Sequence, residues 1–348
     1  MFKKTKTAME VEIYQQPEIL ENIVTSYLKT GIQVPEAVSR IVLVASGSSY
    51  HCARLIADLF DSIADMQARA IYSNEFLLKK NVPQDEDTLY IFITQSGETS
   101  DTVRAAERVK QIGLKTMCIT NNEDSAIWRL CDYKVNCIAG KENSIAATKS
   151  FTAQIMSLYM VVLRYAQLRG QNIDSRIEIL KNIKSVLDKT FEQRHKAKQL
   201  ARLISKMKNV IITADGWSYA LAKEASLKIK ETTYMNVNAN YLGEFMHGHV
   251  AVLNNKCALL YITNSGVSYT TAKNLDKIKK DYNPPIYIIG KAIARFVPNF
   301  NLNVDTDCEV LKMFSNIVFI QLLALETALR LKRNVDKPRG LKKVVLEN

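Results

Sequence analysis

Two short loops rich in serine and threonine are the part of this sequence best suited to bind a phosphate group. Ser46-Gly-Ser-Ser49 and Thr94-Gln-Ser-Gly-Glu-Thr99 each follow an apolar, β-branched-rich run and precede a helix-like pattern. Small hydroxyls and unobstructed backbone N–H groups at a helix start supply neutral donors to an anion. One such loop alone would be explained as helix capping. Two adjacent loops of this composition favour phosphate binding, and neither has the glycine pattern of a nucleotide-binding loop.

A second group that could do chemistry is Glu224, Lys228 and Glu231, whose i, i+4, i+7 spacing places them on one helix face. Taken by itself, this spacing is best interpreted as an exposed Glu–Lys–Glu ladder that stabilises the helix by a few tenths of a kcal/mol. The functional alternative is that a carboxylate of this group acts as a base. It would remove a proton from the carbon next to a carbonyl and return it to the neighbouring carbon.

His247 lies in the segment Glu244-Phe-Met-His-Gly-His249, between Gly243 and Gly248, and is one of only four histidines. A histidine on a loop flanked by glycines can approach a ring oxygen and exchange a proton near neutral pH. His247 and His249 could also be half of a metal site. No third or fourth ligand is apparent nearby, so no metal is expected. His51 and His195 fall in helix-like segments and are treated as non-catalytic.

The elements that must position these groups come from an internal duplication. Residues 41–50 match residues 210–219 at an offset of 169, and the same offset relates 93–97 to 262–266 and 117–120 to 286–289. Gly47, Ser49 and Tyr50 recur as Gly216, Ser218 and Tyr219. In the second copy Asp215 replaces Ser46, and its charge would repel a phosphate, so the phosphate site is expected in the first copy.

Each copy shows short β-branched apolar runs followed by helical periodicity, which predicts an α/β fold with a parallel sheet covered on both faces. Helices are expected after Ser49 and after Thr99, and long helices over 147–168 and 311–332 are expected to close the two copies. The predicted organisation is an N-terminal helical segment (1–30), a first domain (31–170), a basic helical connector (171–198), a second domain (199–340) and a C-terminal tail (341–348).

The 348 residues carry a net charge of +12. Residues 176–208 hold ten basic and three acidic residues, interleaved with apolar residues at helical spacing, so over half of the excess belongs to one amphipathic stretch. It lacks the aromatic interleaving of a nucleic-acid binder, and no nucleic acid is expected. The six cysteines form no C-x-x-C pair. With no export signal and no run of about 18 apolar residues, we expect a cytoplasmic protein without a membrane partner.

Seven motifs, spread over nearly the whole chain, together resemble the sugar isomerase (SIS) domain family. The resemblance is greatest to the tandem-SIS half of glucosamine-6-phosphate synthase and to related phosphosugar isomerases, aminosugar-phosphate deaminases and fructosamine-6-phosphate deglycases. The motifs are Glu12–Pro17, Gly47–Tyr50, Gln95–Thr99, Ala147–Thr152, Glu224–Glu231, Gly243–Gly248 and Pro338–Lys343. The resemblance implies two tandem SIS domains, each a flavodoxin-like three-layer sandwich.

The resemblance also implies roles for single residues. Glu231 would move a proton between C1 and C2 of a sugar 6-phosphate, and His247 would assist ring opening from the neighbouring subunit of a homodimer or larger oligomer. Lys228 and Lys343 would contact the open-chain sugar, with no metal or redox cofactor. The phosphate and sugar would be held by Ser48, Ser49, Thr94, Gln95, Ser96, Thr99 and Ala147, where Ala147 replaces a family serine and weakens one sugar contact.

Departures from the family pattern bear on the reaction. Phe2 stands where the synthase's glutaminase domain would begin with a cysteine, so a glutamine-dependent transaminase is not expected. Met246 and His249 replace the synthase's lysine and proline around the histidine, and Glu244-Phe-Met-His-Gly248 resembles the deglycase branch. The C-terminal motif with Lys343 instead resembles the synthase branch. The expected function is a phosphosugar isomerase acting on a 6-phosphorylated amino sugar or fructosamine, with or without release of the amine. The alternative is a non-catalytic sensor that binds a phosphosugar.

Overall fold

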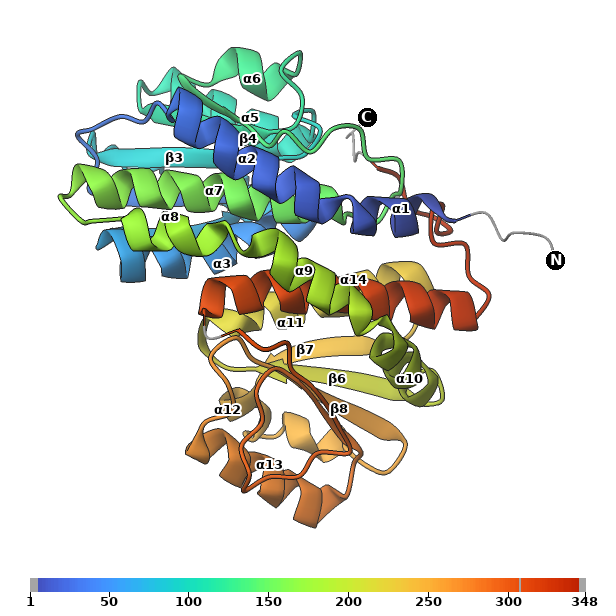
Figure 1. Ribbon diagram of the computed structural model, residues 1–348. Coiled ribbons are helices and arrows are strands. Elements are labelled where there is room, and N and C mark those ends of the chain that lie inside the picture. Colours follow the sequence, from blue (N-terminus) through green and yellow to red (C-terminus); the bar gives the residue numbers. More distant parts are fainter. Residues whose placement is uncertain (1–5, 307, 344–348) are drawn as a thin grey trace. The chain divides into compact units, whose positions relative to one another are not determined.

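Two five-stranded parallel sheets organise the chain in the computed structural model, which describes residues 6–306 and 308–343 (Figure 1). The chain divides into two compact units. The N-terminal unit comprises Gln15–Glu142, Ala147–Lys181 and the chain from Lys342 onward, and the C-terminal unit comprises the chain up to Tyr14, Asn143–Ala146 and Asn182–Leu341. Phe2 and residues 344–348 of the expected C-terminal tail lie outside the described residues.

The N-terminal unit has the strand order β2-β1-β3-β4-β5, with every neighbouring pair parallel. One face of the sheet packs against α4, α5 and α6, whose apolar side chains join Val44, Tyr90 and Phe92 in one core, and α2, α3 and α7 pack together on the other. The strands are β1 Arg40–Ala45, β2 Gln67–Tyr72, β3 Thr88–Ile93, β4 Lys115–Thr120 and β5 Tyr133–Asn136; the helices are α2 Gln16–Thr30, α3 Gly47–Ala64, α4 Ser73–Leu78, α5 Ser100–Gln111, α6 Ala126–Leu130, α7 Lys149–Leu168 and α8 Asp174–Leu180.

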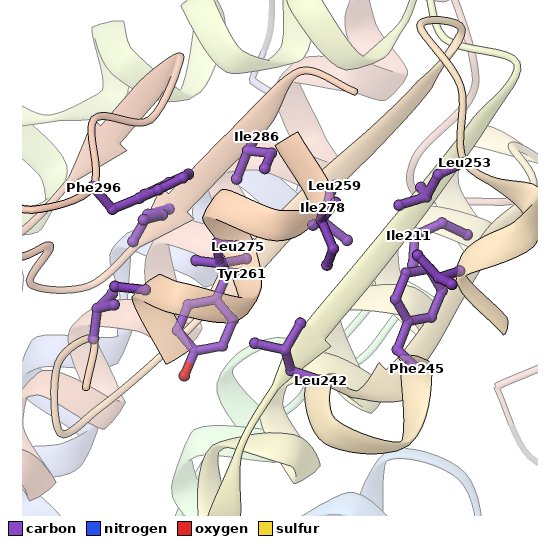
Figure 2. Close-up of a cluster of buried hydrophobic side chains, with 14 of the residues drawn as sticks. Ile211, Leu242, Phe245, Leu253, Leu259, Tyr261, Leu275, Ile278, Ile286 and Phe296 are labelled. Carbon is purple, nitrogen blue, oxygen red and sulfur yellow. The ribbon is translucent and has the colours of Figure 1, made fainter. Parts of the chain in front are cut away.

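The C-terminal unit has the equivalent order β10-β9-β8-β6-β7. Figure 2 shows the core between one face of this sheet and α13, where Leu259 and Tyr261 of the sheet meet Leu275 and Ile278 of the helix. The strands are β6 Asn209–Ala214, β7 Val237–Tyr241, β8 Cys257–Ile262, β9 Ile286–Ile289 and β10 Phe300–Leu302; the helices are α1 Ala8–Tyr14, α9 Ile183–Glu192, α10 Arg194–Ile204, η1 Gly216–Ser218, α11 Tyr219–Thr233, α12 Leu242–Phe245, η2 His249–Val252, α13 Tyr269–Tyr282 and α14 Glu309–Arg330.

The strand registers confirm that the two units are copies of one fold. In the first, Ile41 pairs with Ala68 and Leu89; in the second, Val210 pairs with Val237 and Ala258, which are the same positions displaced by 169. The third predicted match was off by one residue. Ile93 pairs with Ile119, and Ile262 pairs with Ile289, so the offset there is 170 rather than 169. Strands buried on both faces lack alternation, so the sequence did not reveal the slip.

The basic stretch is three helices, α8, α9 and α10, rather than the single helical stretch that its periodicity indicates. The chain turns around Asn182 and again at Gln193, where ψ is 0° and 6°. These turns let α9 and α10 each lay an apolar face against α14. Packing against a common partner therefore decides where the helices end, and local periodicity does not record it.

Among the described residues, one helix, α14, is long and apolar enough to cross a membrane by length and composition. Its most apolar 18-residue window is fully buried inside the protein, which is the position of a core helix. Lys312 and Glu326 interrupt its apolar run, so a search for uninterrupted apolar stretches passes over it. Both side chains are almost fully buried, and Glu326 accepts a hydrogen bond from Arg194 at 2.6 Å.

Candidate active site

The two hydroxyl-rich loops lie side by side because their strands are neighbours. β1 and β3 pair along their whole length, and the last pair is Ala45 with Ile93, immediately before the two loops. In the order β2-β1-β3-β4-β5 the connections leave β1 and β3 in opposite directions, so the two loops follow the strands at the topological switch point of the sheet. This is the position at which open parallel sheets bind ligands.

The hydroxyls at the two N-cap positions of these loops do not cap their helices. Ser46 and Thr99 occupy the N-cap positions of α3 and α5, yet neither side chain accepts a capping hydrogen bond. Thr99 instead pairs through Oγ1 with Thr94 Oγ1 at 2.9 Å, and Ser49 donates to Gln154 Oε1 at 3.0 Å. The capping explanation of the sequence pattern therefore fails at these two N-cap residues.

The Thr94–Thr99 loop is held by the loop that follows β4. The Gln95 carbonyl accepts from Asn121 N at 3.1 Å, and Glu98 Oε1 accepts from Ala126 N at 2.8 Å. Gly97 has φ +73°, and a Cβ atom there would lie 2.0 Å from Ser125 Oγ. These contacts fix the backbone of the loop before any ligand arrives, which lowers the entropic cost of binding.

In the C-terminal unit, the loop after β6, which is the counterpart of the Ser46–Ser49 loop, carries a carboxylate of its own. Asp215 Oδ2 accepts hydrogen bonds from Tyr261 Oη at 3.0 Å and from Thr271 Oγ1 at 3.1 Å. Burial, together with the Asp215 charge, raises the pKa of the Tyr261 hydroxyl. Ser268, the counterpart of Thr99, caps α13 by accepting from Thr271 N at 3.1 Å. The location of the phosphate site in the first copy stays a prediction.

The charged group on α11 is buried, not the exposed ladder that its spacing alone suggests. Lys228 is 1% exposed, and its Nζ lies 2.6 Å from Glu231 Oε2 and 3.5 Å from Glu224 Oε1. Glu224 is also buried, whereas the Glu231 side chain is 21% exposed. Helix α11 packs on β6 with one side and on α14 with another, which buries the first part of this face. Of the two carboxylates, Glu231 is therefore the one that solvent reaches.

His247 occupies an exposed turn between α12 and η2. Its backbone N–H donates to the Glu244 carbonyl at 2.9 Å, and Gly248, with φ +108°, lets the chain turn directly after it. The imidazole makes no hydrogen bond with the residues that the structure describes. The structure therefore brings Lys228 and Glu231 together but does not join His247 to them.

Lys343 meets a residue that the sequence analysis missed. Its ammonium pairs with Glu142, whose side chain is fully buried in the N-terminal unit. Glu142 also accepts from Thr148 N at 2.9 Å and from Ser150 Oγ at 2.6 Å. Burial alone would raise the pKa of this carboxyl, but the Lys343 charge and these hydrogen bonds outweigh it and lower the pKa. Half-buried Ala147 lies next to Thr148, just before α7.

Other predicted residues of the loops remain accessible. Ser48, Gln95 and Ser96 are partly exposed, and Ser96 Oγ accepts from Glu98 N at 3.2 Å, which leaves its hydroxyl proton available. Gln154 is the other residue that sequence reasoning missed. The one available signal was an amide inside an otherwise strongly apolar stretch of α7.

Comparison with known proteins identifies the repeated unit. A family model of the SIS domain matches the chain twice, at residues 36–164 and 203–330. The isomerizing glutamine–fructose-6-phosphate aminotransferase of Campylobacter jejuni is 30% identical over 97% of this chain and 58% of its own length. The enzyme of the same name from Methanococcus maripaludis is 33% identical over 96% of this chain and 56% of its own length. The chain therefore spans less than two thirds of these relatives.

Solved structures show the same architecture over nearly the whole chain. The C-terminal domain of glucosamine-fructose-6-phosphate aminotransferase from Francisella tularensis superimposes with a TM-score of 0.89 at 25% identity, covering 97% of this chain and all of that domain. A glucosamine-6-phosphate deaminase from Thermotoga maritima gives a TM-score of 0.79 at 20% identity, covering 97% of this chain and 99% of its own. The second likeness concerns the fold alone.

Proposed function

The chain belongs to the SIS domain family of phosphosugar isomerases, and on this premise we propose that it transfers a proton between C1 and C2 of a 6-phosphorylated amino sugar or fructosamine. The observation that carries the proposal is the contact between Lys228 and Glu231. A fully buried ammonium is costly to keep unless it is paired. Here it holds, at 2.6 Å, a carboxylate that a substrate can reach. We assign Glu231 as the base that takes the proton from one carbon and returns it to the other.

The other proposed roles follow the residues' chemistry. We assign the phosphate to Ser48, Ser49, Thr94, Gln95, Ser96 and Thr99, whose hydroxyls and amides match the acceptor oxygens of a phosphate, and a sugar contact to Ala147. Lys228 and Lys343 supply positive charge for the open-chain sugar, and His247 exchanges the proton that ring opening requires. None of these steps draws on a metal or redox cofactor.

Proton transfer is common to simple isomerisation and to reactions that add or remove an amine. The relatives from Campylobacter jejuni and Methanococcus maripaludis are aminotransferases of the isomerizing type. We propose that this chain performs at least the isomerisation half of such chemistry on an amino-sugar or fructosamine 6-phosphate. Only the products distinguish simple isomerisation from a reaction that releases the amine, so the assay must identify them.

Nuclear magnetic resonance in deuterated water tests the proposal directly. A panel of 6-phosphorylated amino sugars and fructosamines is incubated with the protein, and deuterium at C1 or C2 and any released amine are measured. We expect deuterium exchange with at least one substrate. In Glu231→Gln the exchange rate should fall by at least about 100-fold, which is within the range that acid–base catalysis contributes. Glu178→Gln, which changes an exposed glutamate paired with Lys181, is the matched control and keeps full activity.

The outcomes separate the enzyme from the sensor. Binding of a phosphosugar without exchange or product across the panel would overturn the enzyme and favour the non-catalytic sensor. Exchange that persists near the original rate in Glu231→Gln would leave the enzyme standing and remove Glu231 as its base. The Gln variant keeps Glu224 beside Lys228, so the buried ammonium is not left without a carboxylate.

We further propose a homo-oligomer, dimeric or larger, in which His247 acts on the substrate of the neighbouring subunit. The exposed, glycine-flanked position of His247 suits a contact with a second copy of the chain. Mixing inactive Glu231→Gln subunits with inactive His247→Ala subunits would then restore activity, because some mixed oligomers combine a native Glu231 with a native His247. No recovery in mixed oligomers of proven composition would contradict the shared site.

A further inference from the structure

The amide of Gln154 on α7 is only half satisfied. The side chain is 2% exposed, and its Oε1 accepts the Ser49 hydroxyl proton at 3.0 Å. Its Nε2 is buried and has no hydrogen-bond partner among the residues that the structure describes. A buried donor left unpaired costs about 1–3 kcal/mol, so the position calls for a physical reason.

This arrangement conflicts with the role proposed for Ser49. A serine hydroxyl carries a single proton. While that proton is donated to Gln154, Ser49 can offer only lone pairs to a ligand, and a phosphate group has oxygen acceptors that lone pairs repel. Ser49 can help to bind phosphate only if its proton is released from Gln154.

Resting on the proposed phosphate-binding role of Ser49, we propose that Gln154 is a positioning residue whose side-chain amide turns over when a sugar phosphate binds. Nε2–H then donates to Ser49 Oγ, and the Ser49 proton is donated to a phosphate oxygen. After this rotation of the amide, Oε1 instead of Nε2 is the atom without a partner, and Ser49 gains a charge-assisted hydrogen bond to the phosphate. Glutamine suits this role because its amide offers an acceptor or a donor at the same place.

The C-terminal unit supplies an internal comparison. Its closing helix α14 buries two amides, Gln321 and Asn316, and Asn316 Nδ2 donates to Thr263 O at 3.1 Å and to Asn264 Oδ1 at 2.9 Å, while the Nδ2 of Asn264 itself has no partner among the described residues. Ser218, the counterpart of Ser49, accepts from Asn264 N at 3.0 Å. The donor of Asn316 is thus held by fixed partners, in the copy whose loop carries Asp215. The closing-helix amide with an unengaged donor lies in the copy to which we assign the phosphate.

Titration calorimetry with inorganic phosphate and with fructose 6-phosphate tests the proposal on the full chain. Gln154→Met keeps the size of the side chain and removes both hydrogen-bonding atoms, and we expect its affinity for both probes to fall about 3- to 10-fold. Gln154→Glu can only accept the Ser49 proton and adds a negative charge, so its affinity should fall more than 10-fold. Gln167→Met, an exposed position on the same helix, is the control without effect.

The decisive comparison adds Ser49→Ala. If Gln154 acts through Ser49, Gln154→Met in the Ser49→Ala background changes affinity less than 2-fold. Turnover of a confirmed substrate would show a raised KM with kcat unchanged. Equal losses in both backgrounds, or a lowered melting temperature with unchanged affinity, would overturn the inference. Absence of binding by the wild-type protein would overturn the proposed function and the inference with it, so the two failures are distinguishable.

Discussion

Replacing Glu142 by glutamine is expected to destabilise the N-terminal unit by about 2–3 kcal/mol at neutral pH. The carboxylate accepts hydrogen bonds from Thr148 N, Thr148 Oγ1 and Ser150 N, at 2.9, 3.2 and 3.1 Å, through Oε1. A glutamine carbonyl can retain these three. Its amide NH₂ would replace Oε2, which accepts from Ser150 Oγ and from Lys343 Nζ. The substitution therefore places an NH₂ donor against the Lys343 ammonium, which is also a donor. It also forces the Ser150 hydroxyl to reorient.

The magnitude follows from the burial of the two partners. Removing one member of a buried ion pair costs about 3–5 kcal/mol when the other member stays buried without compensation. Here the Lys343 side chain is 26% exposed and can recover part of its hydration, which reduces the cost. The three retained hydrogen bonds change from charge-assisted to neutral, each losing part of its strength. Together these terms give the lower range of about 2–3 kcal/mol.

The pH dependence has a definite sign. The pKa of Glu142 in the folded chain lies below its ordinary value of 4.5. Its contribution is thus fully present above the unfolded-state pKa and is lost as the pH falls through the folded-state pKa. The difference in unfolding free energy between the wild type and Glu142→Gln should be constant from pH 6 to 8 and should shrink progressively as the pH falls below the ordinary pKa of 4.5.

Urea unfolding followed by tryptophan fluorescence measures this difference. The chain has two tryptophans, and in a Trp217→Phe background Trp128 reports on the N-terminal unit alone. Lys343→Met is the complementary variant: removing the ammonium should raise the folded-state pKa of Glu142, so the stability that this carboxyl loses in acid becomes smaller and the loss is complete at a higher pH than in the wild type. The same free-energy loss for Glu142→Gln at pH 3 as at pH 7 would refute the electrostatic reasoning.

Two further pairs of substitutions, each a variant with its control, test the loops. Gly97→Ala places a Cβ 2.0 Å from Ser125 Oγ at φ +73° and should lower the unfolding free energy by about 3 kcal/mol or more. Gly113→Ala, with φ +77° and nothing within 4 Å, should lower it by only about 1–2 kcal/mol. Equal losses in urea unfolding would mean that the close contact at Gly97 does not matter. Ser96→Asp should abolish binding of fructose 6-phosphate in calorimetry, while Asp215→Asn leaves the affinity unchanged, and a loss in both variants would contradict a phosphate site confined to the first copy.

The fold followed from the sequence because the information it needed was local and repeated. The 169-residue offset and the apolar runs predicted two copies of an α/β unit with a parallel sheet, the resemblance to the SIS family implied the flavodoxin-like sandwich, and the chain has two five-stranded parallel sheets. The one-residue slip between β4 and β9 escaped detection because continuous apolar runs look alike in either register. The division of residues 174–204 into three helices depends on α14, more than a hundred residues away, and no local pattern encodes it.

The site was predictable only in part, for a related reason. Hydroxyls at strand ends and charges at helical spacing are visible in sequence, whereas a pair such as Glu142 and Lys343 joins residues 201 positions apart. Burial was the other missing quantity. The spacing of Glu224, Lys228 and Glu231 is the same for an exposed ladder and for a buried cluster, and the packing of α11 between β6 and α14 decides between them.

The two copies show why that cluster is better explained by function than by stability. At the positions of α3 equivalent to Glu224 and Lys228, the first copy has Leu55 and Leu59, both buried. The same fold is thus satisfied by apolar side chains there, and replacing a buried ion pair by well-packed hydrophobic residues is often neutral or stabilising. The second copy instead buries a lysine and a glutamate on its α11. At these two positions the duplicated scaffold therefore carries a costly polar pair in one copy only, which is what the proposed reaction would require of the second copy.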